Sequence, residues 1–148
     1  MVKWVLRYLK GSKNVGIVYR KTPEPVEANM DCAIPWGFCN ANYAEDPHDW
    51  KSTSGYVFIL MGGPIAWKSK KQASVALSTM EAEYYTLGIV CQEATRLRQL
   101  FQELSTSFIE PILIYSDNTS AVALSDNLVF HNRLKQIDIR WHFVQNLI

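Results

Sequence analysis

The sequence predicts an α/β domain with a mixed sheet flanked by helices. Two observations lead to this class: strand-like apolar segments precede a long segment of helical spacing, and a further apolar segment follows that helix. The early strands are expected to form an antiparallel meander, which a later strand joins by a crossover. With 148 residues, 48% of them hydrophobic, the chain is large enough for one buried core.

The first half of the chain alternates helix, strand and loop signals. Apolar residues at helical spacing from Val2 to Leu9 predict a helix that ends at residues 10–12. A short strand is expected over 15–19. Residues 22–35 hold three prolines and are expected to form a loop. Residues 36–41 then have the composition of a strand.

The second half begins with a predicted hairpin, in which residues 55–60 and 65–70 are the strands and Gly62-Gly63-Pro64 the turn. A long helix is expected over 78–104. The uninterrupted apolar run over 112–115 is typical of a strand buried on both faces. Residues 119–124 suit a short helix, and 134–148 again show helical apolar spacing.

Composition excludes several classes of protein. The net charge of +1 leaves no overall field for nucleic acid, so such binding would need a local patch. Three cysteines without CxxC spacing indicate reduced residues, not a zinc site or disulfides. No apolar run is long enough for a bilayer, and the N-terminus is too charged for a signal peptide. We therefore expect an intracellular protein with no membrane partner and no small-molecule cofactor.

Two carboxylates stand where an unpaired charge is unfavourable. Glu83 falls inside the apolar stripe of the long helix, while Glu81 points away; Glu83 could also sit at the stripe's edge and pair with a lysine. Asp117 follows the apolar run that ends at Tyr115, and alone it would suit a helix cap or turn. Together, the two acids indicate a site for a hard divalent cation such as Mg²⁺.

Several blocks in order resemble the ribonuclease H domain of Ty1/copia-type retrotransposon polyproteins. Residues 51–58 (KSTSGYVF) match that family's KSTSGYVF, and 64–72 (PIAWKSKKQ) resemble its PISWKSKKQ. Residues 76–84 (ALSTMEAEY) resemble ALSSTEAEY, and 114–118 and 135–140 resemble its YxDN and KHIDIR blocks. The first dozen residues are similar to the tail that follows the reverse transcriptase. The resemblance covers nearly the whole chain.

The resemblance implies an RNase H-like fold, in which four acids hold two Mg²⁺ ions that hydrolyse the RNA strand of an RNA–DNA hybrid. Glu83 and Asp117 match the second and third acids. The first aspartate, of a GYSDADWA block, is here Asn40, and the next is Asn42. The fourth acid belongs to a later block that the sequence does not reach. The resemblance divides the chain into 1–20, a reverse transcriptase tail, and 31–148, an RNase H-like domain lacking its last strand and helix.

The missing acids predict an inactive enzyme. Asn40 offers a carbonyl oxygen without negative charge, so two carboxylates would face two dications and metal binding should weaken. The expected protein is a retrotransposon-derived nuclease domain that has become a pseudoenzyme. One alternative is a working RNase H that takes its missing segment from a partner chain. Another is a repurposed binding or effector protein derived from a transposon.

Basic and polar residues near these acids are candidates for contact with nucleic acid. Lysine side chains beside Trp67 can neutralise phosphates, although a solvated strand end is an equally good interpretation. Side-chain donors after Asp117 could bind phosphate or sugar, or cap a helix. The RNA–DNA hybrid would be recognised by shape, without sequence specificity. The candidate residues are Lys68, Lys70, Lys71, Asn118, Ser120 and Arg133.

Overall fold

The computed structural model describes residues 2–20, 34–104, 111–119 and 123. Helix α1 (Val2–Gly11) is followed by strands β1 (Trp36–Asn42), β2 (Thr53–Leu60) and β3 (Gly63–Lys71), helix α2 (Thr79–Leu104) and strand β4 (Leu113–Ser116). The strands form one sheet in the order β3-β2-β1-β4, in which β4 runs parallel to β1 and the other pairs are antiparallel. This is the predicted meander with a crossover strand, consistent with an RNase H-like fold.

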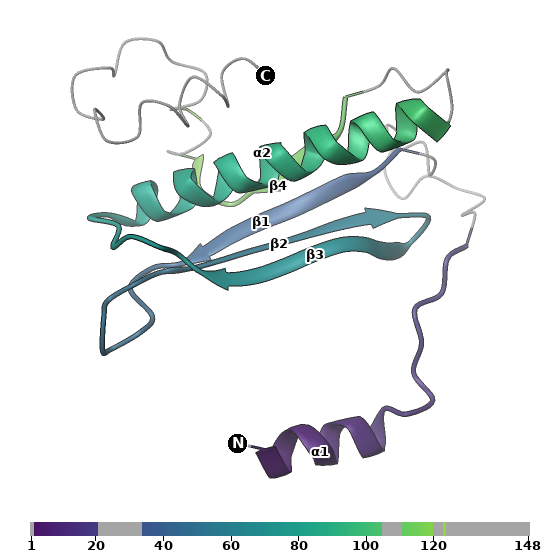
Figure 1. Ribbon diagram of the computed structural model, residues 1–148, viewed down its shortest axis with the longest axis horizontal. Helices are drawn as coiled ribbons and strands as arrows, with labels where there is room; N and C mark the ends of the chain where they lie inside the picture. Colours follow the sequence, from purple (N-terminus) through teal and green to yellow (C-terminus); the bar gives the residue numbers. More distant parts are fainter. Residues whose placement is uncertain (1, 21–33, 105–110, 120–122, 124–148) are drawn as a thin grey trace.

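Helix α2 lies across one face of the sheet, as Figure 1 shows, and the core fills the space between them. Phe58 of β2 and Tyr84 and Val90 of α2 are fully buried there. Cys39 and Cys91 also lie in this core as free thiols, and burial raises the pKa of each to about 11. The expectation of reduced core cysteines is therefore confirmed for these two residues.

Two local features, a turn and a glycine, fix the meander. The β2–β3 hairpin turns through Met61 and Gly62, both with positive φ (50° and 76°), which matches the right-handed twist of the flanking strands. On β1, a side chain at Gly37 would collide with the Phe58 ring, since an added Cβ would lie 2.7 Å from Phe58 Cδ1. The glycine therefore lets the Phe58 ring pack against β1.

Two sequence expectations are wrong. Residues 15–19 run outside the sheet, because their contacts are made to the hairpin turn: the Tyr19 hydroxyl donates to the Pro64 carbonyl over 2.7 Å. Strand β4 is not buried on both faces, since Leu113 and Tyr115 are 47% and 40% exposed. Strand β4 lies at the end of the strand order, and α2 covers only the face that carries Ile114.

Helix α1 stands apart from the sheet in Figure 1, and none of its residues is buried. The proposed boundary after residue 20 stays a prediction. The helices expected over 119–124 and 134–148 fall almost wholly outside the described residues. Within the described segments, no helix has the length and apolar character needed to span a membrane.

Candidate metal and nucleic-acid site

The candidate acids meet at one end of the sheet. Because β1 and β4 are parallel, their carboxyl ends lie at the same edge, where sites of α/β sheets commonly form. Their register pairs Cys39 with Ser116, so Asn40 and Asp117 follow as neighbouring positions on adjacent strands. Helix α2 begins at this same edge and carries Glu83 in its first two turns.

A cap fixes the start of α2. The Ser78 Oγ accepts a hydrogen bond from the Glu81 N–H over 3.1 Å, and Glu81 Oε2 accepts one from the Leu77 N–H over 2.7 Å. The sequence S-x-x-E at 78–81 is the capping-box signature, and both side chains satisfy amides at the helix start. Glu81 is thus occupied at the cap, which agrees with the expectation that it points away from the stripe.

The Glu83 carboxylate is buried, and one of its oxygens accepts no hydrogen bond from any described residue. It is 7% exposed, and its Oε2 has no hydrogen-bond partner among the described residues. Burial raises the pKa of Glu83, a hydrogen bond from the Ala41 N–H opposes the rise, and the negative charge of Asp117 adds to it. The Glu83 carboxylate therefore lies against β1 at Ala41 and within electrostatic range of Asp117.

Asn40 approaches from the other side of the sheet. Side chains alternate along a strand, and Cys39 faces α2, so the exposed Asn40 lies on the face that α2 does not cover. No hydrogen bond joins the Asn40 side chain to either carboxylate in the described part of the chain. Asn40 and Asp117 thus end adjacent strands, but Asn40 lies on the face of the sheet opposite to Glu83, and a joint role of the three residues stays a prediction.

The donor set suits a hard cation but supplies little charge. Buried carboxylate oxygen without a partner is what a divalent ion would use, and Asp117 could add a second carboxylate. The described residues contain no group of three or more His, Cys, Asp or Glu placed to hold a metal. Two carboxylates supply little charge for bridging two dications, and Mg²⁺ binding at this edge stays a prediction.

The three candidate lysines of β3 do not form one patch. Lys68 and Lys70 pair with Tyr56 and Ser54, whereas Lys71 pairs with Thr53. Because side chains alternate along strands, Lys71 faces the side of the sheet opposite to the other two. Lys68 and Lys70 are exposed and make no ion pair with any described residue.

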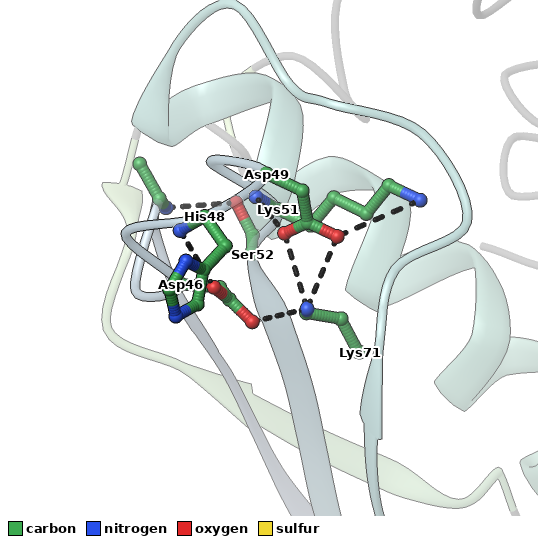
Figure 2. Close-up of polar contacts among 7 residues, drawn as sticks. Asp46, His48, Asp49, Lys51, Ser52 and Lys71 are labelled. Atoms are coloured by element: carbon green, nitrogen blue, oxygen red, sulfur yellow. Dashed lines mark hydrogen bonds and ion pairs between the residues drawn. The ribbon is translucent and has the colours of Figure 1, made fainter.

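Lys71 is held in an ion-pair cluster with the β1–β2 loop. Figure 2 shows its ammonium group between the carboxylates of Asp46 and Asp49, the second at 3.1 Å. The same carboxylates accept from the backbone N–H groups of His48 (2.9 Å) and Lys51 (3.2 Å), which closes the loop. The Lys71 bond lowers the pKa of Asp46, and Asp46 in turn raises the pKa of Lys71.

The remaining candidates are only partly described. The Asn118 N–H lies 3.4 Å from the Ser116 Oγ, as a residue in a turn after β4 would, and its role with nucleic acid stays a prediction. Ser120 and Arg133 lie outside the described residues. Sequence reasoning missed the Asp46–Lys71–Asp49 cluster, since Lys71 lies 25 and 22 positions from the two aspartates and only the polar character of the residues was visible.

Comparison with known proteins shows which polyproteins the sequence is similar to. No protein-family model matches the chain. It is 37% identical over 147 residues, 99% of its length, to the Retrovirus-related Pol polyprotein from transposon TNT 1-94 of Nicotiana tabacum, and equally to that from transposon RE1 of Arabidopsis thaliana. It is also 40% identical over 96 residues to Secreted RxLR effector protein 161 of Plasmopara viticola, which covers 65% of this chain and 62% of that protein.

The chain spans only 10% of the length of each of the two plant polyproteins. A weaker similarity, 25% identity over 124 residues, extends to the Transposon Ty1-ER2 Gag-Pol polyprotein of Saccharomyces cerevisiae. The homologues of this chain are therefore Pol polyproteins of Ty1/copia-type retrotransposons, and the chain corresponds to a short segment of them.

Proposed function

We propose that this chain is the RNase H-like domain of a retrotransposon polyprotein, and that it no longer cleaves RNA–DNA hybrids because Asn40 stands in place of an aspartate. One observation carries the proposal: a buried Glu83 carboxylate, with a free oxygen, lies beside Ala41 and near Asp117 at the carboxyl end of β1. A structural carboxylate in this position would be expected to have a cation or a full set of donors.

The residues of this edge would have distinct tasks. Glu83 and Asp117 would hold Mg²⁺, and Asn40 would contribute at most an amide oxygen. When bound, such ions activate water and stabilise the leaving oxygen of a phosphodiester. With one acid replaced by an amide, charge at the site falls while the fold stays intact, and the Glu83–Asp117 repulsion is not increased by a third carboxylate.

Binding without turnover follows from the same arrangement. Lys68 and Lys70 are free to neutralise phosphates, so hybrid binding is expected to be weak and salt-dependent. Cleavage of a labelled RNA–DNA hybrid with Mg²⁺ tests the proposal. The unaltered chain should cleave no more than a Glu83→Ala variant. Mg²⁺-dependent turnover that Glu83→Ala abolishes would contradict the loss of activity.

A second function has one observation in its favour. The similarity to a secreted effector protein extends over 96 residues, 65% of this chain, so a related segment also occurs in a protein that is named for another role. We propose as the alternative a non-enzymatic binding protein of transposon origin. Hybrid binding that is absent at low salt, in a folded chain, would favour it.

A further inference from the structure

Three polar side chains are buried between α2 and the sheet, next to the turn that carries Glu83. Ser54 of β2 is 5% exposed, Gln72 just after β3 is 3% exposed, and Thr86 of α2 is fully buried. Buried polar groups destabilise a fold unless they are hydrogen-bonded, so such a cluster requires partners.

The cluster is joined by a directed chain of hydrogen bonds. Gln72 Nε2 donates to Ser54 Oγ and to the Ala82 carbonyl, both over 2.9 Å. The Thr86 hydroxyl donates to the same carbonyl over 2.9 Å. Its oxygen lies 2.7 Å from Ser54 Oγ, and because the Thr86 proton is already used, Ser54 is the donor in that bond.

Both ends of this cluster lead to the candidate site. Ala82, whose carbonyl accepts two of the bonds, immediately precedes Glu83. Ser54 is the cross-strand partner of Ala41, whose N–H bonds to the Glu83 carboxylate. Gln72 is itself fixed to the sheet, since its backbone N–H donates to the Ser52 carbonyl over 2.8 Å. The helix turn before Glu83 is thus tied to β2, the neighbour of strand β1 that Glu83 contacts at Ala41.

We propose that Gln72, through Ser54 and Thr86, is a positioning residue that holds the Glu83 carboxylate against Ala41 and toward Asp117. The effect of this role on metal binding rests on the proposed function. The other contacts between α2 and the sheet are made largely by apolar side chains. Groups that orient metal ligands commonly change metal affinity by about 10- to 100-fold when removed.

Thr95 supplies a matched control. Like Thr86, it donates to the carbonyl four residues earlier, Cys91, over 2.8 Å, but it has no strand partner among the described residues. Thr86→Val and Thr95→Val therefore remove the same hydroxyl, and only the first breaks the link to β2. Gln72→Met removes the amide donor at similar volume. If Gln72→Met folds poorly, Thr86→Val tests the same link to β2.

Two readouts separate positioning from ordinary stability. Hydrogen exchange of the Ala41 amide, without metal, should accelerate about tenfold in Thr86→Val and not in Thr95→Val, because that amide bonds to Glu83. In an Asn40→Asp background, the Mg²⁺ dissociation constant should rise about tenfold for Thr86→Val only. Equal exchange at Ala41 and equal Mg²⁺ affinity in the two valine variants would overturn the positioning role.

The experiment keeps the two proposals apart. If Mg²⁺ fails to stabilise the Asn40→Asp chain itself, the metal site is refuted, whereas the exchange at Ala41 still decides whether Gln72 and Thr86 hold Glu83 in place. If Mg²⁺ does stabilise it and the valine variants behave alike, the metal site stands and the positioning role fails.

Discussion

The two faces of β3 predict different effects for its lysines. Lys68 and Lys70 share one face and have no ion pair in the described residues, whereas Lys71 lies between Asp46 and Asp49. Each phosphate neutralised by a lysine contributes about 0.7–0.9 to the slope of log K against log salt. Replacing both free lysines by alanine should therefore reduce that slope by about 1.4–1.8.

This difference is large enough to measure. Over a fourfold rise in salt, from about 50 to about 200 mM, the unaltered chain should lose about 7- to 12-fold more affinity than the double variant. Fluorescence anisotropy of a labelled RNA–DNA hybrid gives the slope. Lys71→Ala is the control on the same strand and should leave it nearly unchanged. If Lys71→Ala reduces the slope as much as Lys68→Ala and Lys70→Ala together, the proposed difference between the two faces of β3 is refuted.

Three further outcomes follow from packing and charge. Glu83→Gln should stabilise the metal-free chain at neutral pH. Because the pKa of Glu83 is raised, the stability that Glu83 contributes is present in acid and is lost as pH rises through that pKa. Denaturant melts of both chains, in acid and at neutral pH, would show the difference in stability. Gly37→Ala should destabilise by about 1–3 kcal/mol through contact with Phe58, and Phe58→Leu in the same chain should recover part of this in a double-mutant cycle. Lys71→Ala should destabilise at neutral pH and not in strong acid, because the Asp46 contribution is lost as pH falls through its lowered pKa; thermal melts across acid pH check this.

The sequence predicted the sheet and the long helix well because their signals are local. The helical spacing over 78–104 and the turn signal Gly62-Gly63-Pro64 each act within a few residues, although the observed turn lies one position earlier than expected, at Met61 and Gly62. The exposure of β4 could not be predicted, since an apolar run does not show whether both faces of the strand are covered by other elements. The strand expected over 15–19 failed because its apolar residues contact the hairpin turn outside the sheet.

The two candidate acids could be proposed from the sequence, but the hydrogen bonds around them could not. The stripe of α2 pointed to Glu83, and the strand end pointed to Asp117. The division of the β3 lysines was visible in principle, since positions 68 and 70 differ by two and position 71 breaks that period. The bonds of Gln72 to β2 and α2 were not, because they join residues 10 to 18 positions apart through side chains.

The most direct test of the metal site is the response of Asn40→Asp to Mg²⁺. Asn42→Asp is the matched control, because Asn42 is exposed on the same strand two positions later and shares its face. At a tenfold excess of Mg²⁺ over the dissociation constant, binding should stabilise the Asn40→Asp chain by about 1.4 kcal/mol, which corresponds to a rise in Tm of about 3–6 °C for a domain of this size. Asn42→Asp and the unaltered chain should show a smaller rise. An Asn40→Asp chain that Mg²⁺ stabilises no more than Asn42→Asp would show that residues 40, 83 and 117 do not form one site.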